Sequence, residues 1–114
     1  ASEALLIHYA VKLIDMGIPM FSISRGAEGA LFYIEGKLYQ CPGLKVELKS
    51  SVGAGDAMVA AFAYALDQNL STSDCVKLAM ATSAGAVSTI GTKPPAKELV
   101  MKLKEQVEIL QIEV

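Results

Sequence analysis

The residue pattern of this chain changes near Lys49, and this change constrains the fold more than any other feature of the sequence. Between residue 20 and Lys49, short runs rich in β-branched and aromatic residues alternate with glycine-containing turns. This pattern is typical of strands joined by tight connections. After Lys49, long runs of small and apolar residues recur at helical spacing. The predicted strands cover residues 20–24, 30–34, 37–41 and 44–48. Because strands and helices bury their apolar faces against one another, the pattern predicts one continuous α/β layer stack.

Four helices are predicted, one before the strands and three after them. They cover residues 3–16, 57–66, 71–89 and 96–110. Gly17 follows the first helix, at a place where a left-handed residue often ends a helix. The second helix carries small or apolar side chains on every side, so it is expected to be buried all round. Ser71 and Asp74 form an N-cap pattern at the start of the third, and the last helix is amphipathic and expected to be exposed.

The length and charge of the chain limit the classes of function. With 114 residues, the chain is long enough for one domain at most. Its 10 Lys and Arg residues against 12 Asp and Glu residues give a formal net charge of −2, so neither nucleic acid nor an anionic membrane is an expected partner. At 53% hydrophobic and 19% charged residues, the chain is too apolar for disorder, and we expect it to bury surface against something outside this sequence.

The cysteines and the start of the chain bear on its location. Cys41 and Cys75 lie far apart and His8 is the single histidine, so the sequence suggests neither a zinc site nor a disulfide framework. The apolar run at residues 57–66 is shorter than the roughly 18 residues that span a bilayer. The first residues lack an initiator Met and a basic region, so they do not resemble a signal peptide. A reducing cytoplasm is therefore the expected compartment.

Residues 51–58 carry most of the chemical information, because a loop of small residues leads there into a helix. The backbone amides of Gly53, Ala54 and Gly55 can point outward together, and the helix dipole adds positive potential, so an anion-binding loop is predicted. Asp56 is expected to be buried among apolar neighbours, where a carboxylate needs a purpose such as accepting a proton or holding a hydroxyl. The alternative is that Asp56 only caps the helix and that the glycines serve helix packing.

Two stretches of the sequence resemble one known family. Residues 50–63, Ser-Ser-Val-Gly-Ala-Gly-Asp-Ala-Met-Val-Ala-Ala-Phe-Ala, resemble the C-terminal signature of the ribokinase-like, or PfkB, family of carbohydrate kinases. Upstream, residues 24–30, Ser-Arg-Gly-Ala-Glu-Gly-Ala, resemble the second nucleotide loop of this family. With both loops in order, the resemblance covers nearly the whole chain. Residues 53–66 are most similar to the phosphosugar branch, the 1-phosphofructokinases and tagatose-6-phosphate kinases.

The resemblance implies a three-layer α/β/α fold, of which this chain would be the C-terminal, nucleotide-binding part without the sugar-binding half. It implies phosphoryl transfer from ATP to a hydroxyl of a sugar phosphate, with Mg²⁺ bridging the β and γ phosphates. Without the sugar-binding half, the isolated chain is expected to be inactive. A homodimer of the full-length protein is left open.

The resemblance also assigns roles to particular residues. Asp56 stands at the position of the catalytic base, and Gly53, Ala54 and Gly55 at the anion hole. The helix that contains Met80 is expected near the adenine. The residues expected at the nucleotide are Ser24, Arg25, Gly26, Ala27, Glu28, Gly29, Gly55, Asp56 and Met80, and no residue is assigned to a metal.

Alternatives to these assignments stay open. A vitamin or nucleoside kinase of the same superfamily would share the Gly-Ala-Gly-Asp loop, because acceptor choice depends mainly on residues outside this sequence. A non-catalytic domain that binds nucleotide weakly, or binds only a partner, is also compatible with the residues. Arg25 either touches a phosphate or lies on the surface at a strand end. His8 is interpreted as a surface or packing residue, and the spacing of Met58, Met80 and Met101 is more typical of core residues than of a cofactor site.

Overall fold

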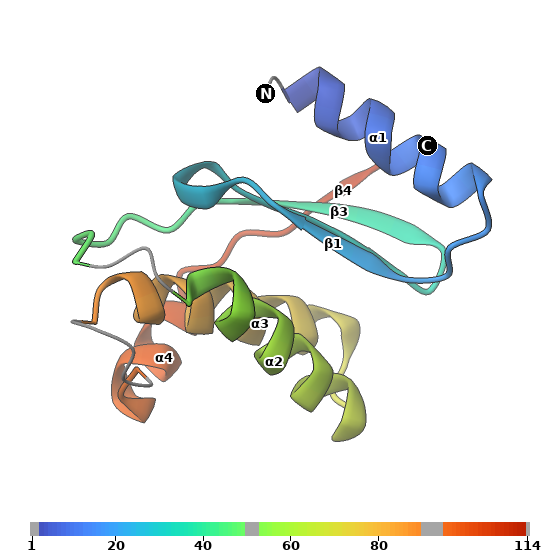
Figure 1. Ribbon diagram of the computed structural model, residues 1–114. Helices are drawn as coiled ribbons and strands as arrows, with labels where there is room; N and C mark the ends of the chain where they lie inside the picture. The colour runs from blue at the N-terminus through green and yellow to red at the C-terminus, as the bar shows by residue number, and fades with distance from the viewer. Residues whose placement is uncertain (1–2, 50–52, 90–94, 114) are drawn as a thin grey trace.

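The chain folds into three layers, with a helix on one side of a sheet and the remaining helices on the other (Figure 1). The structure, a computed structural model, describes residues 3–49, 53–89 and 95–113. The elements in chain order are α1 (Glu3–Asp15), β1 (Phe21–Ser24), the 3₁₀ helix η1 (Gly26–Glu28), β2 (Gly29–Ile34), β3 (Lys37–Pro42), α2 (Ala54–Asp67), α3 (Thr72–Val87), α4 (Lys97–Lys104) and β4 (Leu110–Ile112). The predicted α/β layer stack is confirmed.

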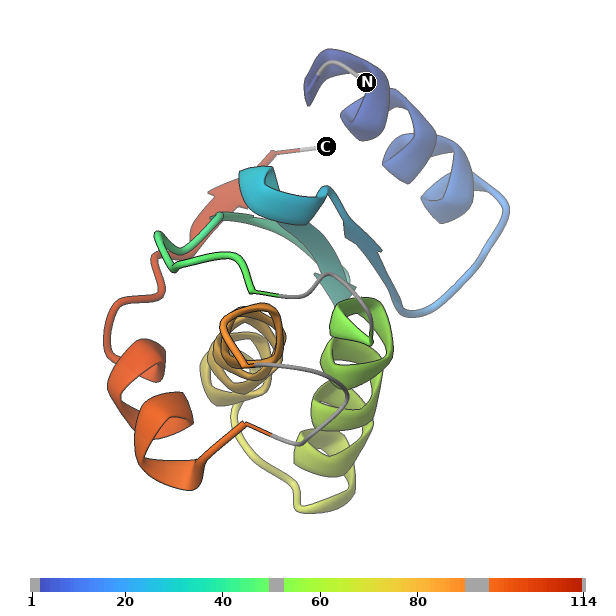
Figure 2. The same cartoon turned by 60° about the vertical axis from the view of Figure 1, so that its left-hand side comes forward.

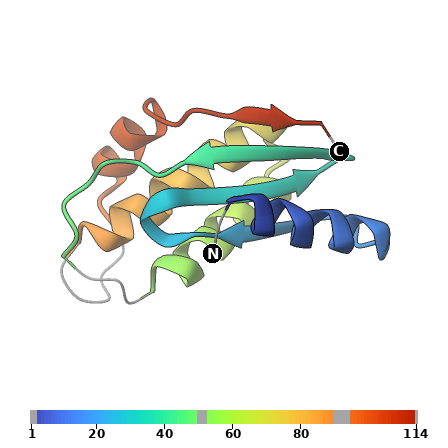
Figure 3. The ribbon, with the colours of Figure 1, turned by 90° about the horizontal axis from the view of Figure 1, so that it is seen from above.

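The sheet has four antiparallel strands in the order β1-β2-β3-β4, so β1 and β4 form its edges (Figure 3). Glu35 and Gly36 join β2 to β3, and both have positive φ, at 52° and 79°. Two residues at positive φ are what a type I′ hairpin requires, so the predicted tight turn is confirmed. From the C-terminal end of the chain, β4 returns to pair with β3, placing Ile112 opposite Leu38.

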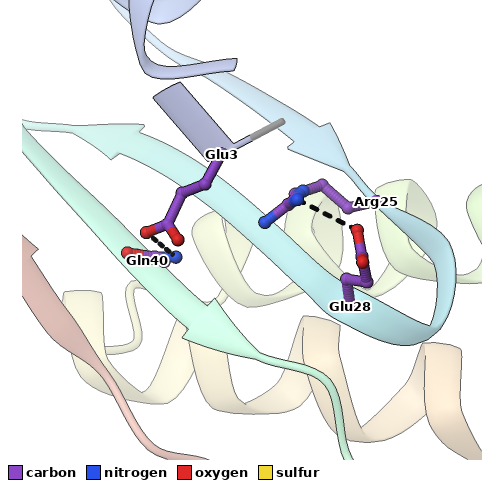
Figure 4. Close-up of polar contacts among 4 residues, drawn as sticks. All are labelled: Glu3, Arg25, Glu28 and Gln40. Atoms are coloured by element: carbon purple, nitrogen blue, oxygen red, sulfur yellow. Dashed lines mark hydrogen bonds and ion pairs between the residues drawn. The ribbon is translucent and has the colours of Figure 1, made fainter. Parts of the chain in front are cut away.

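One face of the sheet packs against α1. Ala10, Leu31 and Leu38 are buried between the two layers, with half-buried side chains of α1 and β1 around them. A hydrogen bond joins the sheet to the first turn of α1, because Gln40 Nε2 donates to Glu3 Oε1 at 2.6 Å (Figure 4). The face toward α1 is therefore apolar at its centre and polar at its rim.

The opposite face of the sheet packs against α2 and α3, as the end view in Figure 2 shows. Alternate residues of β2 point to this side, and the Phe32 ring lies 5.5 Å, centroid to centroid, from the Phe62 ring of α2. The buried residues of this core are Ala30, Phe32, Ile34, Cys41, Met58, Phe62, Ala65, Cys75, Val76, Ala79, Met80 and Val107. Several of them are alanines, which allow the helices and the sheet to approach closely.

Residues 44–48 do not form the predicted fourth strand. The chain leaves the sheet after β3 and runs extended toward α3, where Lys49 N donates to Val87 O at 2.7 Å. The expected alternation is present at Leu44 and Val46, which are half-buried, but they pack against the cluster between α3 and α4. The segment cannot pair with β3 as the next strand of a meander, because β4 occupies that side of β3, and its apolar side chains pack against α3 and α4 instead.

The last helix is shorter than predicted. It ends at Lys104 instead of residue 110, and the chain turns there toward β4. Val107 is buried in the core below the sheet, so the apolar residues of the tail serve the sheet instead of a longer helix. The helix is amphipathic as predicted, but its apolar face is not exposed, because Val100 and Leu103 are buried.

The prediction that α2 is buried all round is wrong for the part of the chain that the structure describes. Its buried face consists of Met58, Ala61, Phe62 and Ala65, at the spacing of one helix face. On the other side, Val59 is 60% and Tyr64 is 59% exposed. The outer face of α2 therefore has no cover among the described residues.

Two predicted helix ends are confirmed. The Ser71 side chain accepts a hydrogen bond from Asp74 N at 3.2 Å at the start of α3, which is the geometry of an N-cap. Gly17 follows α1 at a φ of 82°, as a C-terminal glycine should. Within the described ranges, no helix has the length and apolar character needed to cross a membrane.

Candidate active site

A pocket of about 420 Å³ lies where the loop after β1, the segment after β3, the start of α2 and one face of α3 meet. The predicted nucleotide-site residues that line it are Ser24, Gly26, Ala27, Gly29, Ala54, Gly55 and Met80. Two loops that are distant in the sequence thus border one cavity. Arg25, Glu28, Gly53 and Asp56 are not among its lining residues, and the roles assigned to all these residues stay predictions.

Two glycines with positive φ and two backbone hydrogen bonds define the conformation of the loop between β1 and β2. Gly26 and Gly29 have φ angles of 59° and 115°, which glycine adopts far more readily than other residues. Arg25 N donates to Gly29 O at 2.7 Å, and Glu28 N donates to Arg25 O at 3.2 Å. A Cβ atom on Gly29 would overlap the carbonyl oxygen of Cys41, so the end of β3 packs directly on the loop backbone.

Arg25 and Glu28 pair with each other across η1. Arg25 Nη2 donates to Glu28 Oε2 at 2.9 Å, and Figure 4 shows the two side chains facing each other beside the loop. The Arg25 side chain is 13% exposed, so it is not the surface residue that one interpretation expected, whereas the Glu28 side chain is 68% exposed. The pair therefore links the start of the loop to its end.

The start of α2 forms the other side of the pocket. Gly53, at a φ of 84°, precedes the helix, and Ala54 and Gly55 lie in its first turn. Asp56 is exposed, so the expectation that its carboxylate is buried among apolar neighbours is wrong. The cause is helical geometry: Met58 points into the core, and a residue two positions earlier lies about 200° around the helix, on the far side.

One face of α3 forms the wall opposite the loops. Met80, Ser83, Ala84 and Val87 line the pocket, and their spacing of three, four and seven residues places them on one side of the helix. Met80 is only 4% exposed, so it serves the core as well as the wall. Ser83 is the polar side chain of this wall.

The segment after β3 closes the pocket, and none of its residues was predicted at the site. Gly43, Leu44, Val46 and Leu48 all line the cavity. The alternation of the last three was visible in the sequence, but it predicted a strand and gave no sign that its apolar side would face a pocket. A Cβ on Gly43 would overlap the carbonyl oxygen of Ala27, so this segment touches the glycine loop directly.

None of the described residues that line the pocket carries a charge. Among the residues the structure describes, no group of three or more His, Cys, Asp or Glu side chains is placed to hold a metal ion. Burial raises the pKa of the Cys41 thiol to about 12. Burial, followed by the negative charges of Asp74 and Glu35, also raises the pKa of Cys75. Both thiols are therefore protonated at neutral pH and are not activated nucleophiles.

The chain matches a known family over most of its length. Residues 1–99 match the model of the pfkB family carbohydrate kinases. A 1-phosphofructokinase of Haloferax volcanii is 32% identical over 111 residues, which are 97% of this chain and 36% of that protein. The chain therefore belongs to the pfkB family of carbohydrate kinases, and the predicted family is confirmed. It spans about a third of the length of the curated relatives it matches.

Solved structures of the same class share the fold. The phosphofructokinase-2 of Escherichia coli superposes with a TM-score of 0.83 at 25% identity, over 93% of this chain and 35% of that one. The ribokinase of Arabidopsis thaliana, solved with ribose and ATP, gives a TM-score of 0.78 at 25% identity, over 91% of this chain and 35% of that one. The predicted ribokinase-like α/β fold is confirmed.

Proposed function

We propose that the protein containing this chain transfers a phosphoryl group from ATP to a hydroxyl of a sugar phosphate. In this proposal the chain is the C-terminal, nucleotide-binding part of the kinase. The observation that carries the proposal is the pocket at which the glycine loop after β1 meets the start of α2. Membership of the pfkB family supports the reaction class, and the similarity to a 1-phosphofructokinase supports a phosphosugar acceptor.

ATP suits this pocket because two of its sides differ in chemistry. Toward α2, backbone amides and the helix dipole favour the negative charge of a triphosphate. A Cβ on Gly55 would meet nothing within 4 Å, so a phosphate can approach the backbone there. Toward α3, the walls carry Val46, Met80 and Val87, which suit the flat apolar faces of a base. The loop from Ser24 to Gly29 would then lie along the ribose and phosphates, with Arg25 and Glu28 holding it in shape.

Asp56 is proposed as the general base. A sugar hydroxyl has a pKa far above 7, so it becomes a better nucleophile when a carboxylate takes its proton during attack, which contributes about 10² to 10⁴ in rate. The exposure of Asp56 leaves its carboxylate open to an acceptor held by another part of the protein. The amides of Gly53, Ala54 and Gly55 would stabilise the charge on the transferring phosphoryl group.

Mg²⁺ is proposed to enter with the phosphates of ATP. The described residues offer no ready cluster of ligating side chains, and Mg²⁺ usually keeps several waters and binds through one or two carboxylates plus substrate phosphates. When bound, it would neutralise charge on the β and γ phosphates. No role assigned to the residues of this chain requires a metal held by the protein alone.

Fructose 1-phosphate is the proposed acceptor, by similarity to the Haloferax volcanii enzyme, with tagatose 6-phosphate as the near alternative. Ribose is a second candidate, because a ribokinase solved with ribose and ATP shares the fold. A panel of these sugars, with a nucleoside and a vitamin alcohol added, would separate the phosphosugar kinase from other kinases of the superfamily. A complete protein that binds ATP and phosphorylates none of them would support the non-catalytic alternative.

The decisive experiment replaces Asp56 with Asn in the complete kinase. We expect Asp56→Asn to lower kcat by about 10² or more, because it removes a base that acts only in the transition state. The ATP dissociation constant, measured by calorimetry, should stay within a few-fold, because the proposed ATP contacts at this site are backbone donors. Asp67→Asn, at the opposite end of α2, is the matched control and should leave both quantities unchanged.

Two outcomes would contradict this assignment. If Asp56→Asn kept normal turnover and melting temperature, Asp56 would have no catalytic role. If ATP affinity collapsed instead of kcat, Asp56 would organise the loop or the metal and would not be the base.

A further inference from the structure

Ser83 places one hydroxyl on a wall of the pocket that is otherwise apolar. It lies on the same face of α3 as Met80 and Val87, one turn from each, and all three residues line the cavity. Among the described residues that line the pocket, Ser24 is the other one with a hydroxyl, and it belongs to the glycine-loop side. Ser83 therefore stands where the proposed function places the base, away from the proposed phosphate side.

The hydroxyls of Ser88 and Thr89, near the end of α3, differ from that of Ser83 in their hydrogen bonds. Ser88 Oγ lies 3.0 Å from Ala84 O and 3.1 Å from Gly85 O and can donate a hydrogen bond to either carbonyl. Thr89 Oγ1 donates to Gly85 O at 2.7 Å. These two side chains bond back to carbonyls of their own helix, a common arrangement for Ser and Thr. The Ser83 side chain, which is half-buried, makes no such hydrogen bond with the residues that the structure describes.

A ligand that fills the pocket would withdraw the half-buried Ser83 hydroxyl from water. Withdrawing a hydroxyl from water into apolar surroundings costs free energy unless a hydrogen bond compensates it. The neighbouring wall side chains, Met80, Ala84 and Val87, offer no strong donor or acceptor. A ligand with polar groups at its edge and apolar faces would satisfy both the hydroxyl and the wall, and a nucleobase has this combination.

We propose that the Ser83 hydroxyl hydrogen-bonds the edge of the base of the nucleoside triphosphate donor and so sets its base preference. This proposal rests on the proposed function and identifies Ser83 as the residue of α3 that recognises the base. A serine hydroxyl can both donate and accept, so its partner on adenine is the 6-amino group or one of the ring nitrogens N1, N3 and N7.

The test combines a substitution with ATP analogues, using the complete kinase. Ser83→Ala removes the hydroxyl, and alanine favours the helix more than serine does, so the fold should be retained. We expect the KM for ATP to rise by about 3- to 10-fold, the range for one neutral hydrogen bond, with kcat unchanged. Ser88→Ala is the matched control on the same helix, because that hydroxyl is bonded to helix carbonyls, and it should leave the KM for ATP unchanged.

Four analogues then identify the partner, each lacking one of N1, N3, N7 or the 6-amino group. One of them should bind the wild-type enzyme about 3- to 10-fold more weakly than ATP, and Ser83→Ala should bind it as well as it binds ATP. If Ser83→Ala bound ATP like the wild type and ranked the analogues in the same order, the inference would be overturned. A folded wild-type protein that bound no nucleotide at all would overturn the proposed function instead, and this inference with it.

Discussion

Two glycines that line the pocket, Gly43 and Gly55, differ in the space that they leave for a Cβ atom. Neither Gly43 nor Gly55 has the left-handed φ that would by itself require glycine. A Cβ on Gly43 would overlap the carbonyl oxygen of Ala27 and stand 3.2 Å from Gly29 N, whereas one on Gly55 would meet nothing within 4 Å. Gly43 is therefore needed because two backbone segments cross there, and Gly55 is not needed for packing.

We expect Gly43→Ala to lower the free energy of unfolding by about 1–3 kcal/mol, the usual cost of inserting an atom into filled space. The same change should weaken ATP binding, because the Ala27 carbonyl belongs to the glycine loop of the pocket. Gly55→Ala, within helix α2, should instead raise the free energy of unfolding by up to about 1 kcal/mol. Urea denaturation of both variants checks this, and equal stability of the two would show that the crossing is not tight.

Among the helices and strands, those whose ends depend on nearby residues were predicted well. The helix α3 begins at its N-cap, and the turn between β2 and β3 lies at Glu35 and Gly36, because caps and two-residue turns are local interactions. The errors fall on segments whose partners are distant in the sequence. The alternating pattern of residues 44–48 and the helical spacing of 105–110 were both present, but packing against α3, α4 and β3 decided their conformation.

The N-cap of α3 can be tested separately from the site. Ser71→Ala should lower the free energy of unfolding by about 1 kcal/mol, because Asp74 N loses its acceptor, whereas Ser71→Asp should retain most of the stability. Ser73→Ala, an exposed position in the first turn of the same helix, is the control and should have little effect. Thermal unfolding of the three variants gives the order, and a loss at Ser73 as large as that at Ser71 would contradict the cap assignment.

Considered as a whole, the molecule has an apolar core. Among the residues the structure describes, no polar or charged side chain is buried, while Cys41 and Cys75 lie in the core between the sheet and the helices. Both thiols are favoured in their neutral form there, since burial raises the pKa of each. The stability of the folded chain therefore depends on pH in the alkaline range.

The pKa of Cys41 rises from 9.0 to about 12 on folding, so the unfolded chain releases this proton at a lower pH than the folded chain. The contribution of the Cys41 thiol to the free energy of unfolding is constant below pH 9. It is lost between pH 9 and 12, by up to about 1.4 kcal/mol per pH unit. Comparing wild type with Cys41→Ala cancels the titration of other groups. We expect the difference between their free energies of unfolding to decline above pH 9, and curves that stay parallel to pH 11 would contradict the buried neutral thiol.

The sequence by itself determined the layer class, the helices α1 and α3, the strands β1 to β3 and the two loops that identify the family. These features depend on caps, turns, hydrophobic period and the order of residues along a short stretch, all of which neighbouring residues set. The roles of Asp56 and of the loop residues remain predictions that the experiments above address.

Only the tertiary structure decided which surfaces meet. It placed four residues of the loop after β1, the start of α2 and Met80 around one pocket. It also added the segment from Gly43 to Leu48 as the cover of this pocket and left Asp56 exposed. It also brought β4 from the end of the chain to the edge of β3. The physical reason is the same in each case: a strand partner, a buried face and a pocket wall are supplied by residues far away in the sequence, so no local pattern contains them.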